Sequence, residues 1–379
     1  MRKLLFPGWL GGALLALTLA GCDAPREAVT IHEHNAVPDN LSDWHVVEAI
    51  DGKLVLNERV TPYDLNTALF TDYAHKLRTV WMPEGASAVY GEDDFDYPVG
   101  TVISKTFYYP LATDGSVLNT DDYSADFAGS GLNLNKVKLI ETRLLVKRVD
   151  GWQALPYVWN EAQTDAVLEI AGDAKRLQLV SADGSSERFT YVVPDANQCA
   201  GCHADNHTQK AIRPIGPRAR HLNKDYAYQE GTENQLLYWQ QMGYLSGLPE
   251  LAAVPRNVDY KDVAASLDER ARSYLDINCG HCHNPSGAAD TSGLMLYGAE
   301  HDMRRLGVCK PPVAAGTGSG DRLFAIVPGS PEASILNFRV ESTDPGAMMP
   351  ELGRSLAHKE GAELLKQWIA SMPGSCKAG

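Results

Sequence analysis

Two segments of the chain bring paired cysteines next to a histidine at one fixed spacing. They read Cys199-Ala200-Gly201-Cys202-His203 and Cys279-Gly280-His281-Cys282-His283, so both have the form CxxCH. Two thiols three positions apart can each form a thioether to one vinyl group of a haem, and the adjacent histidine can then ligate the iron. The spacing therefore predicts two covalently attached haem c groups, with His203 and His283 as iron ligands.

The same four cysteines have two other interpretations. Two CxxC pairs can form a four-cysteine zinc site, and a single pair can act as a redox dithiol. Both interpretations leave His203 and His283 as coincidences. Two complete CxxCH motifs in one chain therefore favour haem.

A loop near the C-terminus carries adjacent methionines. The segment 345–353 reads PGAMMPELG. It resembles the distal loop of class I cytochromes c, in which a methionine crosses the haem face opposite the histidine. This resemblance implies Met349 as the second ligand of the iron at His283, with Met348 as the runner-up. In the other interpretation both are core side chains. A Met/His pair favours electron transfer over catalysis.

The second ligand of the iron at His203 stays open at this point. The segment 204–231 holds no methionine. The candidates are two histidines of that segment, one methionine beyond it and two residues of the preceding region: His207, His221, Met242, His75 and Met82. An iron with an open sixth position would make this haem a candidate catalytic centre.

The first of the seven cysteines follows an export-type leader. Met1-Arg2-Lys3 precedes an apolar run over 4–20, and this order predicts a signal peptide. The residues LAGC at 19–22 resemble the bacterial lipobox, which implies lipidation of Cys22 and a tether at the membrane surface. A cleaved signal without lipid is the alternative. Asp23 resembles a signal for retention at the inner membrane.

The last two cysteines follow the second motif. An exported protein folds in an oxidising compartment, so we expect a disulfide between Cys309 and Cys376. Two free thiols are the alternative.

Composition limits the classes of partner. The 379 residues include 34 Lys and Arg and 48 Asp and Glu, for a net charge of −14. This balance argues against nucleic acid as a partner, since binding to phosphates needs a basic surface. We expect other redox proteins, such as a dehydrogenase, a cytochrome or an oxidase, to dock through a basic face.

The residue pattern changes at Pro194. Runs of β-branched and aromatic residues separated by turn signals predict an antiparallel, sandwich-like region before it, and helical spacing appears at 234–242, 267–278 and 361–370 after it. We therefore expect an α+β multidomain chain, with a β-rich domain followed by two mostly α-helical haem domains. Its parts are a lipoprotein signal peptide at 1–21, a tether at 22–40, the β-rich domain at 41–194, a first c-type haem domain at 195–265 and a second, class I cytochrome c-like haem domain at 266–379.

Longer stretches resemble a family of bacterial dihaem c-type cytochromes that is largely uncharacterised. The matching stretches begin near residue 40 and extend over most of the chain: 62–85, 139–166, 214–223, 274–287, 307–320 and 341–361. The resemblance implies haem attachment at Cys199, Cys202, Cys279 and Cys282, with His203, His283 and Met349 as iron ligands. It implies no substrate.

These patterns predict a lipid-anchored dihaem c-type cytochrome that transfers electrons between exported redox proteins. We expect it on the periplasmic face of a bacterial membrane, with the inner membrane favoured. The alternative is a dihaem peroxidase-like or other haem oxidoreductase whose first haem is open. In a third interpretation the β-rich region binds a substrate or partner and the haems are its electron outlet.

Overall fold

The computed structural model describes residues 26–129, 131–204, 211–313 and 315–377. The predicted signal peptide at 1–21 lies outside these ranges, as do the predicted lipidation site Cys22 and the candidate ligand His207. Within them, every helix is too short or too polar to cross a lipid bilayer.

Strands dominate the first half of the chain. They are β1 (Val47–Ile50), β2 (Lys53–Leu56), β3 (Thr61–Tyr63), β4 (His75–Trp81), β5 (Ala88–Val89), β6 (Val102–Pro110), β7 (Val117–Asn119), β8 (Leu132–Asn133), β9 (Val137–Arg148), β10 (Gly151–Trp159), β11 (Ala166–Leu168), β12 (Asp173–Ser181), β13 (Ser186–Val193), β14 (Asp225–Tyr228), β15 (Gly231–Asn234) and β16 (Leu245–Ser246). The helices are α1 (Ala196–His203), α2 (Ala219–Leu222), α3 (Gln235–Gln241), α4 (Leu267–Asn278), α5 (Ile335–Glu341) and α6 (Lys359–Ser371).

One antiparallel sheet forms the centre of the molecule. It has six strands in the order β11-β10-β9-β6-β4-β3. Successive side chains of a strand point to opposite faces. On one face, Leu77, Val102 and Leu144 belong to a core that also contains Trp44. The other face is the one that matters for the candidate site, and we call it the motif face.

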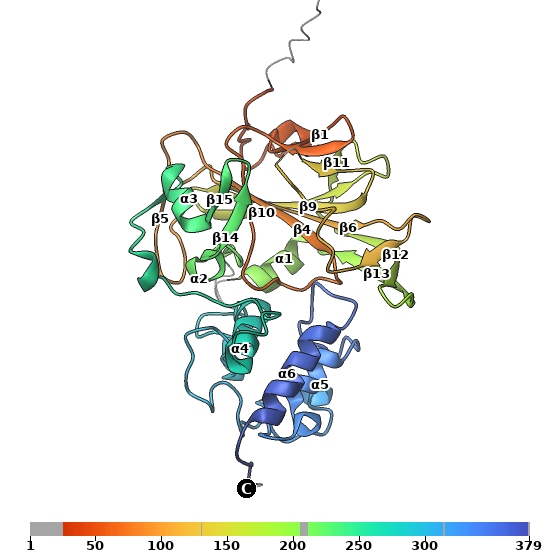
Figure 1. Cartoon of the computed structure of the whole chain (residues 1–379), viewed down its shortest axis with the longest axis vertical. Coiled ribbons are helices and arrows are strands. Elements are labelled where there is room, and N and C mark those ends of the chain that lie inside the picture. The colour runs from red at the N-terminus through yellow and green to blue at the C-terminus, as the bar shows by residue number, and fades with distance from the viewer. Residues whose placement is uncertain (1–25, 130, 205–210, 314, 378–379) are drawn as a thin grey trace, which may run out of the picture.

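The motif face has apolar residues at both ends. At one end, Val80 and Ile103 pack in a core with Leu222 and Trp239 from the segment after residue 194. At the other end, Phe107 packs in a core with residues of β12 and β13. Helix α1 contacts β10 and lies against this face in Figure 1.

Helices α4, α5 and α6 form the lower part of the molecule in Figure 1. Ser266 and Glu269 form a capping box that begins α4. Leu275, Leu336 and Leu365 join these helices in one core. Gly361 lets α6 lie close to α4, because a Cβ at this position would overlap the ring of Tyr274.

The predicted β-rich domain followed by two mostly α-helical haem domains is wrong as a fold class. Strands make up 28% of the structure and helices 19%, and two mostly helical domains are not seen in the described residues. Helices α3, α4 and α6 lie where the spacing predicts helix. The segments between them are irregular, and the segment after Pro194 shares a core with the sheet. Local periodicity locates a helix, but it does not show how little of a segment the helix fills.

The resemblance to dihaem c-type cytochromes is corrected on the same observation. A chain of that family would be largely helical, whereas this chain has mostly strands. The prediction of haem attachment at the two CxxCH motifs does not depend on this resemblance, because it follows from the motif residues themselves.

Candidate functional site

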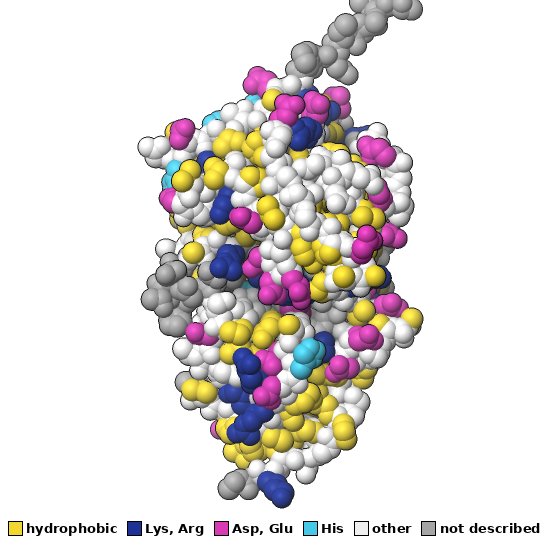
Figure 2. Space-filling model, turned by 90° about the vertical axis from the view of Figure 1, so that its left-hand side faces the viewer, with side chains coloured by type: hydrophobic (Ala, Val, Ile, Leu, Met, Phe, Trp, Pro, Cys, Tyr) yellow, Lys and Arg dark blue, Asp and Glu magenta, His cyan; other side chains and the backbone are white. Residues whose placement is uncertain are grey.

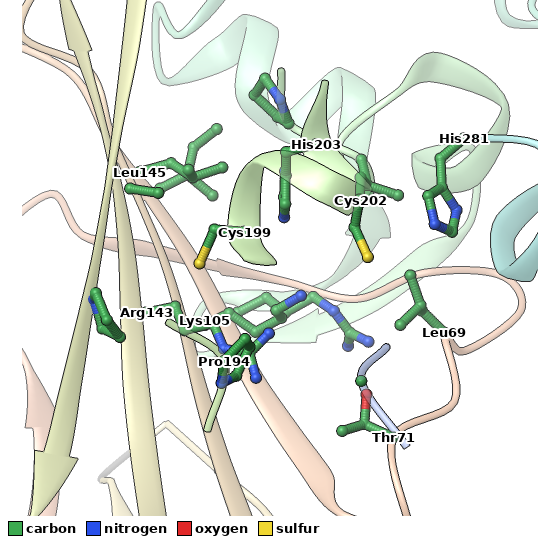
Figure 3. Close-up of a pocket in the computed structure, with 18 of the residues that line it drawn as sticks. Leu69, Thr71, Lys105, Arg143, Leu145, Pro194, Cys199, Cys202, His203 and His281 are labelled. Carbon is green, nitrogen blue, oxygen red and sulfur yellow. The ribbon is translucent and has the colours of Figure 1, made fainter. Parts of the chain in front are cut away.

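The first CxxCH motif lies in helix α1. A capping box begins this helix: the backbone N–H of Gln198 donates to Asp195 Oδ1 over 2.8 Å, and that of Asp195 donates to Gln198 Oε1 over 3.1 Å. Cys199, Cys202 and His203 then line one cavity between the helix and the motif face. In Figure 3 both thiols and the imidazole point into this space.

The second motif begins where helix α4 ends. Cys279 is the C-cap of α4, and the backbone N–H of His283 donates to the carbonyl of Cys279 over 2.9 Å. Cys279, Cys282 and His283 line a second cavity in the lower part of the molecule.

The two cavities are neighbours. Cys202 of the first motif and His281 of the second line both of them. Figure 3 shows His281 beside Cys202, at the edge of the first cavity. Tertiary structure therefore brings the two motifs to a common wall.

Both motif histidines have the protonation state that iron ligation needs. His203 Nδ1 lies 2.6 Å from the carbonyl oxygen of Arg213, and His283 Nδ1 lies 3.2 Å from that of Leu294. A carbonyl only accepts hydrogen bonds, so each Nδ1 carries the proton and each Nε2 keeps its lone pair. Burial lowers the pKa of His203 to about 3 and that of His283 to about 4, which keeps both rings neutral.

All four motif cysteines are free thiols held in the protonated form. Burial raises the pKa of Cys199 and Cys202, and it raises the pKa of Cys279 and Cys282 to about 12. A redox dithiol works through a thiolate, which these surroundings disfavour.

Within the described ranges, no three or more His, Cys, Asp or Glu side chains gather in a way that holds a metal ion. A haem iron needs only one or two protein ligands, because the porphyrin supplies the other four. The donor set of each cavity, two thiols and one neutral imidazole, fits a covalently attached haem.

Met349 lines the second cavity together with His283. Met348 is buried, with 9% of its surface exposed, and is not among the residues that line this cavity. The guanidinium of Arg354 holds the loop: it donates to the carbonyl oxygens of Met349 over 2.9 Å and of Ser342 over 2.8 Å. The structure thus places Met349, and not Met348, at the cavity that contains His283.

The described candidates for the second ligand at His203 lie elsewhere. Both ring nitrogens of His75 have partners, 2.7 and 3.1 Å away. His221 is buried beside Asp276, and Met82 and Met242 pack in or against a hydrophobic core. None of these four lines the first cavity.

Three residues that line the first cavity were missed by the sequence analysis: His281, Lys105 and Arg143. His281 Nδ1 lies 3.2 Å from the carbonyl oxygen of Ile277, so its Nε2 also keeps a lone pair. The available signals were a histidine at a variable position of the motif and a single cation within the otherwise uncharged strand β6. Arg143 gave no comparable signal, since β9 carries five charged residues.

The structure joins Cys309 and Cys376 in a disulfide with Cα atoms 5.3 Å apart. Cys376 follows helix α6, so the bridge ties the end of the described chain to the segment after the second motif. No known protein family, curated protein or solved structure matches the chain.

Proposed function

We propose that the chain carries two covalently attached haem c groups and transfers electrons between exported redox proteins. One observation carries the proposal: two CxxCH motifs, far apart in the sequence, have their thiols and histidines on adjacent cavities that share Cys202 and His281. The neutral imidazoles of His203 and His283, each oriented by a backbone carbonyl, support it.

Cys199 and Cys202 would hold one haem, and Cys279 and Cys282 the other. Each thiol adds across one vinyl group: the sulfur forms a bond to one vinyl carbon and the proton goes to the other. The bound haem supplies a centre that takes up and releases one electron. Met349 would supply a thioether to the haem that His283 ligates, and such a Met/His pair would raise the reduction potential and exclude small ligands.

The common wall favours electron transfer. Electron transfer between two redox centres slows steeply with distance, and here the two cavities meet at the side chains of Cys202 and His281. An electron that enters at one haem would therefore pass readily to the other.

The location and partners are part of the proposal. The leader at 1–21 and Cys22 favour a lipoprotein on the periplasmic face of a bacterial membrane, with the inner membrane favoured. The net charge of −14 favours partners with a basic docking face, but the charge is uneven: Figure 2 shows Lys and Arg gathered on the lower part of one face. Dehydrogenases, cytochromes or oxidases fit as partners, and nucleic acid does not.

A peroxidase-like haem oxidoreductase is the second candidate. It rests on the observation that none of His75, His221, Met82 and Met242 lines the first cavity. An iron without a sixth ligand at His203 would bind peroxide.

The test is intact-mass measurement after expression in a host that attaches haem c. The full chain is expected to gain the mass of two haems. The double variants C199S/C202S and C279S/C282S are each expected to gain the mass of one, and the fourfold variant none. The control C309S/C376S removes two cysteines outside the motifs and keeps both haems. A wild-type protein without added haem mass, or with bound zinc instead, would overturn the proposal.

Electron transfer and peroxidase activity are then separated by spectroscopy on the same protein. Two low-spin irons that do not bind carbon monoxide when reduced support electron transfer. A high-spin iron that binds peroxide and survives C279S/C282S supports the peroxidase-like candidate.

A further inference from the structure

Three cationic side chains lie side by side on the motif face of the central sheet. Arg78 on β4 is directly opposite Lys105 on β6, and Lys105 is directly opposite Arg143 on β9. Directly opposite residues of antiparallel strands point to the same face, with Cβ atoms about 4.5–5.5 Å apart, and like charges there are destabilising. We call these three residues the cationic row.

The two outer members of the row have carboxylate partners. Arg78 Nη1 donates to Asp64 Oδ1 over 2.8 Å, and Arg143 Nε donates to Glu141 Oε2 over 2.7 Å. Lys105 has only a ring beside it: its Nζ lies 5.1 Å from the ring centroid of Phe107. No hydrogen bond or ion pair joins this ammonium group to a residue that the structure describes.

Without a bound anion, the cationic row destabilises the folded chain. The same strand positions two residues away are apolar, with Ile103 on one side and Phe107 on the other. Burial, with Arg143 and Arg78 adding to it, lowers the pKa of Lys105 to about 7. Asp64 and Glu141 neutralise the two outer cations, so the charge of Lys105 is the one that a bound anion would neutralise.

The row faces the first motif. Arg78, Lys105 and Arg143 line the same cavity as Cys199, Cys202 and His203. In Figure 3 the thiols of Cys199 and Cys202 point toward the side on which Lys105 and Arg143 lie. An anion held by the row would therefore lie in the cavity that the first haem is proposed to occupy.

We infer that the cationic row is a carboxylate-binding subsite of the first cavity, with Lys105 as the direct partner of the anion. This inference rests on the proposed function, because a haem attached at Cys199 and Cys202 brings two propionate carboxylates into the cavity. A free oxyanion has the same chemistry, so the experiment separates the two sources.

The test uses the C279S/C282S background, which keeps only the first haem. Three variants are compared in it: K105Q removes the charge, K105R keeps it, and K175Q removes the charge of Lys175, which pairs with Asp173 on β12, away from the first cavity. Intact mass first shows whether each protein carries its haem. If the proposed function is wrong, none of these proteins will carry a haem, whatever residue stands at position 105.

Reduction potential is the second measurement. A positive charge next to a haem carboxylate disfavours the oxidised centre, which carries one more positive charge than the reduced one. K105Q is therefore expected to lower the potential, while K105R and K175Q leave it near that of the background. An unchanged potential in K105Q contradicts the propionate source.

Anion titration is the third measurement. Acetate, nitrite and phosphate are added to the background and to K105Q, with and without attached haem, and the visible spectrum or the melting temperature is followed. A saturable response that K105Q abolishes assigns the subsite to a free oxyanion. The subsite is overturned if neither the reduction potential nor the anion response depends on Lys105. It is also overturned if K105Q turns the iron high-spin, because Lys105 would then be an iron ligand.

Discussion

The two motif cavities contain the same five-residue pattern in different surroundings. The first lies against the motif face of the central sheet, where β4, β6 and β9 supply the cationic row. The second is built almost entirely from the chain after residue 278, with mainly apolar walls, two cations and Met349. A CxxCH motif thus specifies attachment, while the surrounding residues decide charge and ligation.

Charge separates the two cavities most clearly. Lys310 and Arg339 line the second cavity, but both are used by backbone groups: Lys310 Nζ donates to the carbonyl of Ser292 over 2.7 Å, and Arg339 Nε to that of Ala347 over 2.8 Å. Lys105 in the first cavity has no such partner among the described residues. If the proposed haems are bound, we expect the reduction potential of the first to depend on Lys105 and that of the second on Met349.

The largest expected effect is the loss of one axial ligand. In the C199S/C202S background, which keeps the second haem, M349A is expected to open the iron at His283, because Met349 lines that cavity. The reduced protein should then bind carbon monoxide completely, and its reduction potential should fall.

M348A is the matched control, since Met348 is the adjacent, buried methionine. It should lower the free energy of unfolding by about 2–5 kcal/mol without opening the iron. Carbon monoxide binding by M348A but not by M349A would reverse the assignment.

A smaller effect is expected from removal of the disulfide between Cys309 and Cys376. C309S/C376S should lower the free energy of unfolding by about 2–4 kcal/mol, because the open chain gains conformational freedom when it unfolds. Hydrogen exchange should quicken in α4, α5 and α6 and stay unchanged in β6 and β9. Equal loss of protection in the sheet would show that the two parts unfold together.

The smallest effect concerns pH and the first cavity alone. Lys105 has a pKa of about 7 in the folded chain, below its value of about 10.4 in an unfolded chain. Because burial is the main cause, we expect the lowered pKa to persist in C199S/C202S, from which the first pair of thiols is removed. Between these two values the unfolded chain binds more protons than the folded one, so stability rises with pH. Below pH 7 both forms are protonated, and the folded chain bears the full cost of the buried charge.

We expect a gain of about 2–3 kcal/mol in the free energy of unfolding from pH 6 to pH 9, measured in urea. The charged groups that act on Lys105 in this variant are Arg143, Arg78 and Glu141. K105M should abolish the gain and stabilise the protein at pH 6. The same gain in K105M would assign the pH dependence to another group.

Part of the candidate site could be read from local sequence. The CxxCH spacing identifies thiols and a histidine that one helical turn or one tight turn brings together, and α3, α4 and α6 lie where the spacing predicts them. The helical domains expected around them were wrong, because most of the segment after residue 278 has no period and folds as irregular backbone. The three helices α3, α4 and α6 fill only a small part of the segment after Pro194.

What the sequence by itself determined is the chemistry available: four thiols in two pairs, each beside a histidine, and two further cysteines. Only the tertiary structure decided that the two motifs share a wall and that Arg78, Lys105 and Arg143 stand opposite one another. The reason is the range of the interactions. Motif spacing acts within one turn of the chain, whereas strand register and cavity walls depend on the packing of segments that are far apart in sequence.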